Sequence, residues 1–437
     1  MSTPEGSEST ALNPAAPPHA RRRLLIISQV FLPDPASVGQ HIADVAIELV
    51  RRGHRVKVYA ANRAYEDASV RFLPRENIQG VEVRRLPLSS FGKRRMITRL
   101  LGTITFTIQA FFVALLSPRV DAILFSTSPP LIGFVVSLAA MVRRIPVAYW
   151  AMDLNPDQLI ALKKIKPAGL VARVLEGVNR FILRRAALVV ALDRFMADRL
   201  RPRAPIDSKL EIIPPWPHEN FLHPVDQGTN PFRVRHDLVG KFVVMYSGNH
   251  SPSNPLTTLL RAAVAFKDDP DLRFLFVGGG LGKKEVEAVV AEQKPGNILA
   301  LPYQPLADTR YSLSAADVHV VSLGDDMVGI IHPCKIYGAM AAARPILFFG
   351  PKPSHVSDLL DEHVFGWHVS HGDVAGAIEA IRQIRRTPRA RLEEMGAVAD
   401  RVLHANLGQQ ILCNRFCDAL EARCHLHPAR SEAILPA

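Results

Sequence analysis

Residues 327–350 read MVGIIHPCKIYGAMAAARPILFFG, and this stretch predicts a helix of small residues that leads into a buried strand. Lys335 lies near the start of that helix, where free backbone N–H groups and the helix dipole favour an anion. Nucleotides and phosphates commonly bind in the crevice outside the carboxyl ends of parallel strands. The segment therefore indicates a phosphate site, although an ordinary helix–strand unit with a solvated lysine explains it equally well on its own.

Two hydrophobic runs precede this segment. Residues 241–249 (KFVVMYSGN) and 272–280 (LRFLFVGGG) are rich in β-branched and aromatic residues, contain glycine at their ends and lead into helix-like patterns. Glycine at such a turn permits positive φ and lets a ligand approach the backbone. Together with the helix that carries Lys335, the two turns predict one phosphate-binding edge of a parallel sheet.

A series of motifs, taken in order, resembles the family 4 glycosyltransferases. The motifs of the second half are YSGNHS (246–251), FLFVGGG (274–280), LPYQPLADTRYSLSAADVHVVSL (301–323) and HPCKIYGAMAAARPIL (332–347). Those of the first half are LLIISQVFLPDPASVGQHIADVAIELVRRGHRVKVYAA (24–61), STSPPL (126–131) and YWAMDLNPDQLI (149–160). The resemblance, to the exopolysaccharide, colanic acid and O-antigen subgroup, implies a retaining enzyme of the α/β GT-B fold. In that fold two Rossmann-like, doubly wound parallel-sheet domains face each other across a cleft.

Length and element order agree with two domains. A chain of 437 residues exceeds one ordinary core and suits two domains of about 200 residues each. An alternating order of strands and helices predicts parallel sheets covered by helices on both faces. In the first domain we expect strands at 23–29, 54–60, 81–87, 120–126, 145–151, 187–191 and 210–213.

The expected domain boundaries follow from composition and from the resemblance. They are a disordered tail (1–20), an acceptor-side domain (21–221), a linker (222–229), a nucleotide-sugar-binding domain (230–404), a helix that returns to the first domain (405–425) and a second tail (426–437). The first tail is rich in Ser, Thr, Pro and Ala and lacks the apolar stretch of a signal peptide. Four cysteines without paired C-x-x-C spacing predict neither a disulfide framework nor a zinc site. We therefore expect a cytoplasmic protein, with no metal and no cofactor other than the nucleoside-diphosphate sugar used as donor.

A net charge of +12 and a pI near 9.8 call for an acidic partner. We find no module typical of nucleic-acid binding, so an anionic membrane surface is the better match. Residues 100–118 carry no charge and follow the basic residues Lys93, Arg94 and Arg95. We expect a lipid-inserted, membrane-associating helix near residues 97–117 on the inner face of the cell membrane; a buried core helix and a true membrane span are the alternatives.

The candidate donor-binding residues fall into two groups. The residues expected at the diphosphate are Gly39, Gln40, Gly248, Asn249, His250 and Lys335, with Ser37 as the cap of the first helix. The resemblance places the nucleoside against Gly278, Gly279, Tyr303, Gln304, Tyr337 and Gly338. A purely structural turn is the alternative for Gly39.

Three residues are catalytic candidates. Asp153 and Asp157 follow an apolar strand, where a carboxylate could orient or deprotonate an acceptor hydroxyl, or could simply cap the next helix. His332 precedes Pro333 and could reach the departing phosphate or the sugar, or could be structural. Many family members carry two glutamates eight positions apart near this point, and the matching positions here are Ile330 and Gly338. Others have a C-K-x-Y-G pattern in their place, and residues 334–338 (CKIYG) are similar to it.

The sequence therefore predicts a peripheral membrane glycosyltransferase. It would move a sugar from a nucleoside-diphosphate sugar to a polyprenyl-diphosphate-linked saccharide, with retention, in cell-surface polysaccharide assembly. A catalytically silent GT-B protein that binds nucleotide sugar or acts as a scaffold is one alternative, and a sugar-nucleotide epimerase or hydrolase is another. A nicotinamide dehydrogenase is disfavoured because no G-x-G-x-x-G follows the first strand.

Overall fold

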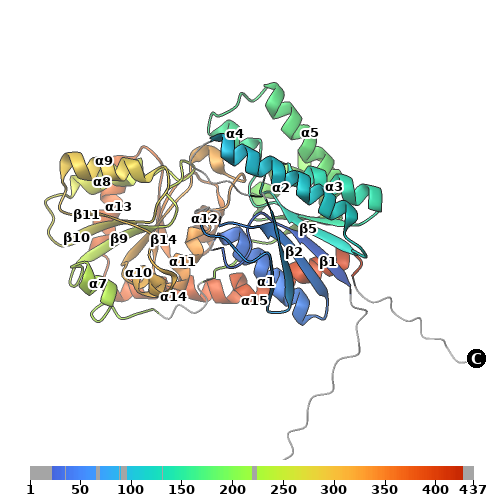
Figure 1. Cartoon of the computed structure of the whole chain (residues 1–437). Helices are drawn as coiled ribbons and strands as arrows, with labels where there is room; N and C mark the ends of the chain where they lie inside the picture. Colours follow the sequence, from blue (N-terminus) through green and yellow to red (C-terminus); the bar gives the residue numbers. More distant parts are fainter. Residues whose placement is uncertain are drawn as a thin grey trace, which may run out of the picture.

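The computed structural model describes residues 22–34, 36–64, 69–87, 89, 96–129, 131–218 and 224–426. The tail expected at 1–20, nearly all of the second tail, the start of the expected linker and the basic residues 93–95 lie outside this part of the chain. Two parallel α/β units lie side by side (Figure 1).

The first unit contains an eight-stranded sheet with the order β3-β4-β2-β1-β5-β6-β7-β8. Its strands are β1 (Arg23–Ile27), β2 (Arg55–Ala61), β3 (Arg75–Ile78), β4 (Val81–Leu86), β5 (Ala122–Ser126), β6 (Val147–Trp150), β7 (Leu188–Ala191) and β8 (Leu210–Ile212). Its helices are α1 (Ser37–Arg51), α2 (Met96–Leu116), α3 (Ile132–Arg143), α4 (Asp157–Ala161), α5 (Leu170–Arg185) and α6 (Arg194–Leu200).

The second unit contains a six-stranded sheet, parallel throughout, with the order β11-β10-β9-β12-β13-β14. Its strands are β9 (Phe242–Ser247), β10 (Leu272–Val277), β11 (Ile298–Leu301), β12 (Val318–Ser322), β13 (Ile346–Phe349) and β14 (Gly366–Val369). Its helices are α7 (Pro231–Arg235), α8 (Thr257–Ala265), α9 (Lys283–Gln293), α10 (Thr309–Ser314), α11 (Lys335–Ala341), α12 (His355–Glu362), α13 (Val374–Arg386) and α14 (Arg389–Val402).

The last helix, α15 (Gln409–Arg423), packs on the first unit against α1 (Figure 1). Its buried Phe416 stacks on Trp150 at the end of β6, with ring centroids 4.2 Å apart. Arg52, just after α1, donates to Asp418 (2.6 Å) and Glu421 (2.8 Å) of α15. Apolar and charged contacts together therefore join the end of the chain to its first helix.

One strand departs from the expected parallel pattern. β3 pairs antiparallel with β4 through a two-residue turn, Gln79–Gly80, in which both residues have positive φ. The strand is polar (RENI) and none of its side chains is buried, so the sequence contains no apolar run that would predict it. The expectation of parallel strands throughout is therefore wrong at this edge of the sheet.

The helix α2 carries apolar residues on both of its faces, the one that packs on the domain and the one that is exposed. Phe106, Ala110 and Ala114 are fully buried, and the helix packs against α3. The opposite face exposes a line of large apolar side chains. None of the helices in the described part of the chain combines the length and hydropathy needed to cross a membrane, so the alternative of a true span is wrong.

Candidate active site

The carboxyl end of the second sheet meets the first unit through the loop 327–332. The amide of Leu154 donates to the carbonyl of Ile330 (2.9 Å), and Arg199 Nε donates to the carbonyl of Val328 (2.6 Å). Gly329 has φ +70°, and a Cβ there would lie 2.5 Å from the carbonyl oxygen of Phe195. A glycine is needed at this position because the two units approach each other backbone to backbone.

The loops that follow β9 and β10 pack tightly on each other. Gly248 has φ +131° and Gly278 has φ +123°, conformations that favour glycine. A Cβ on Gly278 would lie 2.1 Å from the carbonyl oxygen of Gly248, which leaves no room for a side chain between the loops. A Cβ on Gly279 would approach the ring of Tyr303 to 3.0 Å. The structure thus brings the two predicted glycine turns and Tyr303 together.

Lys335 extends along this pair of loops. Its Cε would lie 2.7 Å from a Cβ placed on Gly248, and its ammonium lies 5.4 Å from the centroid of the Tyr246 ring. No described residue accepts a hydrogen bond from this ammonium or pairs with it as an ion. Burial lowers the pKa of Lys335 to about 8. A partly desolvated cation that no described carboxylate neutralises, beside glycine loops, is suited to hold an anionic group.

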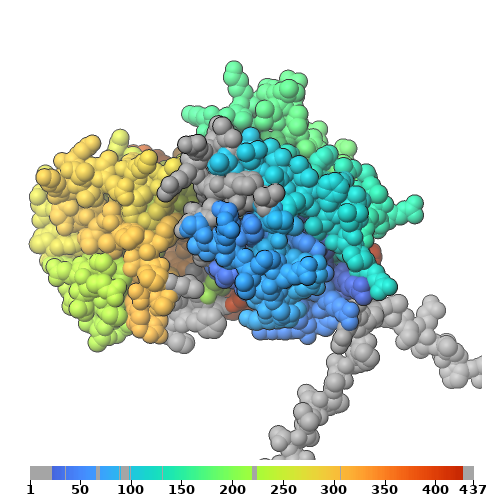
Figure 2. Space-filling view, viewed as in Figure 1, coloured from blue at the N-terminus to red at the C-terminus, as the bar shows by residue number. Residues whose placement is uncertain are grey.

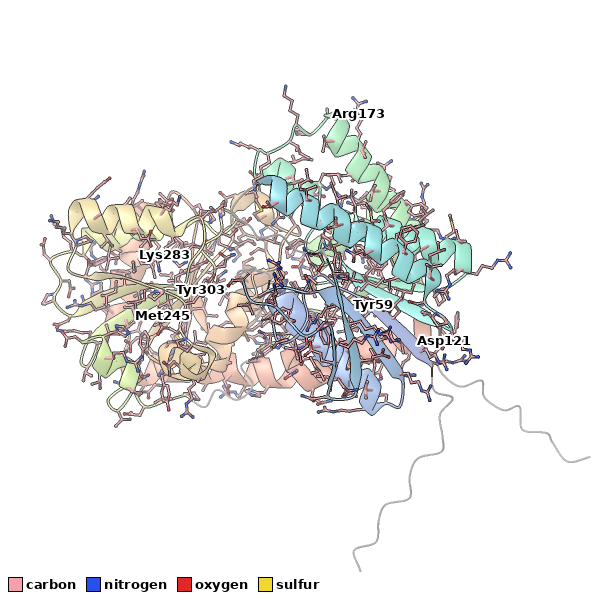
Figure 3. All side chains as sticks on the ribbon, viewed as in Figure 1. Tyr59, Asp121, Arg173, Met245, Lys283 and Tyr303 are labelled. Carbon is pink, nitrogen blue, oxygen red and sulfur yellow. The ribbon has the colours of Figure 1, made fainter. Side chains whose placement is uncertain are left out.

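Lys283, in the same region, was not predicted from the sequence. Its ammonium is buried and donates to the carbonyls of Phe276 (3.0 Å), Gly278 (2.8 Å) and Leu301. It therefore holds the ends of β10 and β11 together. Figure 3 labels Lys283 and Tyr303 in this part of the second unit. The pair Lys283–Lys284 gives no sign in the sequence of which lysine turns inward.

The remaining donor-side candidates of this unit have varied environments. His250 is buried, and its pKa is lowered to about 4 by burial and by the charge of Lys283, so the ring is neutral. Its Nε2 is buried and has no hydrogen-bond partner in the part of the chain that the structure describes. The carbonyl of Asn249 accepts from the Tyr246 hydroxyl (2.8 Å). Tyr303 is 59% exposed and Gln304 is half-buried, so both are open to a ligand.

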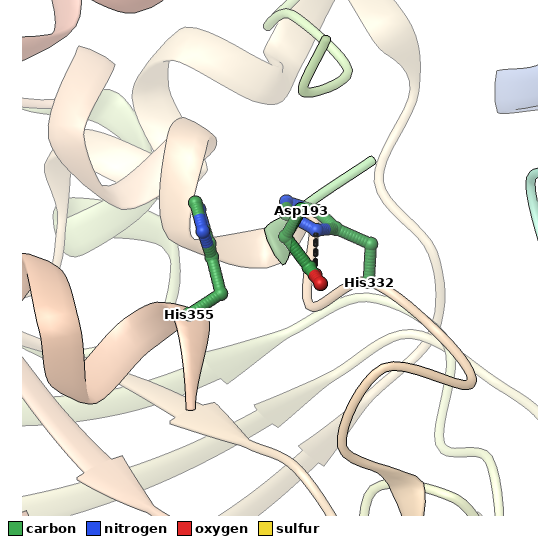
Figure 4. A group of neighbouring side chains, drawn as sticks. All are labelled: Asp193, His332 and His355. Atoms are coloured by element: carbon green, nitrogen blue, oxygen red, sulfur yellow. Dashed lines mark hydrogen bonds and ion pairs between the residues drawn. The ribbon is translucent and has the colours of Figure 1, made fainter. Parts of the chain in front are cut away.

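A buried chain of hydrogen bonds crosses between the units (Figure 4). Asp193, the N-cap of α6, lies 2.8 Å from His332 Nδ1; His332 Nε2 lies 2.7 Å from the Tyr337 hydroxyl, which lies 3.3 Å from His355 Nε2. Burial acts to raise the pKa of Asp193, but the hydrogen bond and charge of His332 prevail and lower it. Burial lowers the pKa of His355 to about 3 and raises that of Tyr337 well above its usual value.

These pKa shifts agree with an ionised aspartate, a neutral His355 and a protonated tyrosine, which form one continuous chain of donated hydrogen bonds. His355 donates to the Tyr337 oxygen, Tyr337 donates to His332 Nε2, and His332 Nδ1–H donates to the Asp193 carboxylate. The ligand-type atoms of Asp193, His332 and His355 lie within 4.8 Å of one another, close enough for a metal ion. Both nitrogens of His332 are already used in hydrogen bonds, so the arrangement fits a positioning network between the units.

This network changes two of the sequence-based roles. Tyr337, expected at the nucleoside, is only 1% exposed and its hydroxyl bonds to His332, so it is an interior residue. His332 is held on both sides within the same network. Gly338 lies half-buried within α11 and contributes no side chain to the site.

Of the two aspartates, only Asp153 has a carboxylate without a hydrogen bond or ion pair to another described residue. Burial raises its pKa to about 6, and it lines a small cavity of about 40 Å³ with Thr127 and Asn155. A carboxyl group with such a pKa suits proton transfer near neutrality. Asp157 instead accepts from Arg203 Nη2 at 2.6 and 2.7 Å and lies 3.6 Å from Arg199. Its expected acceptor role is therefore replaced by a salt bridge that holds α4.

In the first unit, Gly39 lies in the first turn of α1. A Cβ there would lie 3.1 Å from the amide nitrogen of Phe31, so glycine permits close packing of the helix on the preceding loop. Gln40, next to it, is half-buried. The expected cap, Ser37, is wrong: Ala36 is the N-cap, and its amide donates to Asp34 Oδ1 (3.0 Å).

Comparisons with known proteins match one family description to each unit. "Glycosyl transferase 4-like domain" matches residues 37–216, and "Glycosyl transferases group 1" matches residues 241–386. The chain is a GT-B glycosyltransferase.

This glycosyltransferase has curated relatives and structural neighbours of similar length. It is 27% identical over 327 residues to the probable glycosyltransferase WbjE of Pseudomonas aeruginosa, covering 74% of this chain and 80% of WbjE. It is 23% identical over 331 residues to the putative colanic acid biosynthesis glycosyl transferase WcaI of Escherichia coli K12, covering 73% and 81% of the two chains. The crystal structure of Anabaena HepE with UDP and glucose superposes with a TM-score of 0.67 at 15% identity, covering 92% of this chain and all of HepE.

Proposed function

We propose that this glycosyltransferase moves a sugar, with retention of anomeric configuration, from a nucleoside-diphosphate sugar to a polyprenyl-diphosphate-linked saccharide at the inner face of the cell membrane. The observation that carries the proposal is Lys335, a cation without a described partner beside the Gly248 and Gly278 turns. As the bond to the sugar breaks, charge develops on the diphosphate, and a fixed cation stabilises that charge. Two similar proteins support the donor class and the pathway: HepE, whose structure holds UDP, and WcaI, a putative colanic acid biosynthesis glycosyl transferase.

Asp153 is the candidate that we assign to the acceptor side. Its pKa of about 6 leaves part of the population able to accept a proton near neutral pH. The residues of the hydrogen-bonded network, Asp193, His332 and Tyr337, act as positioning groups because they join the two units beside the donor loops.

The test offers purified protein a panel of UDP-, GDP- and dTDP-sugars, with polyprenyl-diphosphate-sugar acceptors in liposomes. Acceptor-dependent product with the donor's anomeric configuration supports the proposal. Lys335→Met is expected to abolish turnover, whereas Lys284→Met, an exposed lysine nearby, is a matched control that keeps it. Conversion of the sugar nucleotide without any acceptor would instead support an epimerase or hydrolase.

A silent donor-binding scaffold is the second candidate, and one observation favours it. The two positions that carry glutamates in many family members are Ile330, which is buried, and Gly338, so neither supplies a carboxylate. Donor binding measured by calorimetry, without product across the panel, would favour this candidate and refute the transferase.

A further inference from the structure

A hollow of about 630 Å³ opens on the first unit, at the end of its sheet opposite the active site. Its walls come from the last turns of α2, with Phe112, Val113 and Leu116, and from the first residues of β1 and β2. The active-site loops follow the carboxyl ends of the strands, whereas this hollow lies at their amino ends. It is therefore separate from the donor and acceptor sites.

Basic side chains surround the hollow. Arg23, Arg55 and Arg119 line it, and the structure gives none of these three side chains a hydrogen bond or ion pair with any described residue. Two further cations, Lys57 and Arg84, share a single acid, Glu82, at 3.1 and 2.7 Å. Five cations therefore face one carboxylate, which leaves a strong positive potential over an apolar floor.

The same hollow forms one end of an exposed apolar line on α2. Leu100, Ile104, Ile108, Phe112 and Leu116 recur every four residues, and each is between 44% and 71% exposed. The sixteen residue steps from Leu100 to Leu116 span about 24 Å of helix, and an apolar surface of that extent marks a binding surface. Figure 2 shows α2 and the neighbouring strands on one face of the molecule, and Figure 3 labels Tyr59, which lines the hollow.

We propose that this face binds anionic phospholipid of a bilayer. The phosphate of one lipid lies in the hollow on Arg23, Arg55 and Arg119, its acyl chain lies on Phe112 and Leu116, and the apolar line of α2 enters the boundary between headgroups and acyl chains. A second copy of this chain is the less suitable occupant, because a two-fold contact would bring the same cations against each other. This inference deepens the proposed function, in which the acceptor is membrane-bound.

The test measures vesicle binding of the full chain by sedimentation. Vesicles of phosphatidylcholine alone are compared with vesicles that also contain phosphatidylglycerol, and binding is expected only to the second kind, with a decline as salt rises. Removing two surface cations should lower the partition coefficient about 30-fold, so Arg55→Glu with Arg119→Glu should lower it by at least that factor. The matched control, Lys284→Glu with Arg386→Glu, makes the same charge change on exposed residues of the second unit and should retain binding.

A second variant tests the apolar part. Phe112→Ser with Leu116→Ser keeps every charge and is expected to weaken binding to phosphatidylglycerol vesicles, while an excess of inorganic phosphate should not displace the wild type. Equal loss in the control pair, full displacement by inorganic phosphate, or a concentration-dependent dimer that Phe112→Ser breaks would overturn the proposal.

Donor turnover with a water-soluble acceptor separates this inference from the proposed function. The charge-reversed variant is expected to keep wild-type turnover in solution and to lose it only on vesicles. If the wild type shows no transfer at all, the vesicle measurements still decide whether the lipid site exists. If the variants bind vesicles as the wild type does, the lipid site is refuted whatever the transfer assay shows.

Discussion

Replacing Lys335 by methionine should remove one cation from the diphosphate and nothing else of similar importance. Methionine fills nearly the same path along Gly248, where the lysine stem is already packed. A hydrogen bond to a charged group contributes about 1.5–3 kcal/mol, so the dissociation constant for UDP should rise about 10- to 150-fold. The fold should survive, since the ammonium forms no hydrogen bond or ion pair with a described residue in the free protein, and its one described cation–π contact is the Tyr246 ring, 5.4 Å away.

The pKa of Lys335 also determines how UDP binding should depend on pH. Its pKa is about 8 in the free protein because burial disfavours the charge. A bound diphosphate favours the ammonium and raises that pKa, so binding takes up a proton above pH 8. The terminal phosphate of UDP is ionised above about pH 7, so the lysine alone governs the decline there, and affinity should fall about tenfold between about pH 7 and 9.

Isothermal titration of UDP at several pH values measures both effects. Lys335→Met should bind weakly and lose the decline between neutral and alkaline pH, whereas Lys335→Arg should keep the charge and also lose the decline. Lys284→Met is the control, because its side chain is exposed. The reasoning is refuted if Lys335→Met binds UDP as the wild type does, with the same pH dependence.

Three further results are expected. Gly248→Ala should weaken UDP binding and lower the free energy of unfolding by about 1–3 kcal/mol, because its Cβ would meet the lysine stem at 2.7 Å and its φ is +131°; calorimetry and urea titration check this. Asp193→Ala and His332→Gln should each lower the free energy of unfolding by about 2–3 kcal/mol, as measured by urea titration. The double variant should lower it by much less than the sum of the two single changes. His41 and His319 are buried with a pKa of about 4, below the usual 6.5, so the unfolded chain binds more protons between these values. Stability should therefore fall as the pH drops from about 6.5 to 4, by up to about 3 kcal/mol per histidine, and His319→Gln should flatten the decline measured by urea midpoints.

The parts of the fold that the sequence predicted well are those with strong apolar patterns. β9 and β10 are continuous runs of β-branched and aromatic residues, and each ends where a glycine with positive φ begins the next loop. Such runs are typical of buried parallel strands, so their place and type followed directly. β3 lacked any such run, because it lies at the sheet edge and none of its side chains is buried.

Side-chain partners were harder to predict than elements. Tyr337 and His332 stood in a motif that suggested ligand contact, yet they bond to each other, and His332 also pairs with Asp193, 139 residues away in the sequence. Asp157 likewise forms a salt bridge with Arg203, which no local pattern predicted. Pairings of this kind depend on how distant segments pack, and no local pattern of residue types encodes them.

The energetics of Lys335 bear on the choice between an active enzyme and a silent scaffold. A half-buried amine with a pKa of about 8 costs the folded protein stability at neutral pH, because the charged form is partly desolvated and has no hydrogen bond or ion pair with a described residue. Residues that carry such a cost are typical of functional sites, where stability is exchanged for binding or catalysis. Ile330 and Gly338 carry no comparable cost in folding stability. Ile330 packs in the core between the units, and Gly338 lies within the helix α11. Under the proposed function we therefore expect a set of donor contacts without these two carboxylates, in which Lys335 beside the two glycine turns binds the diphosphate.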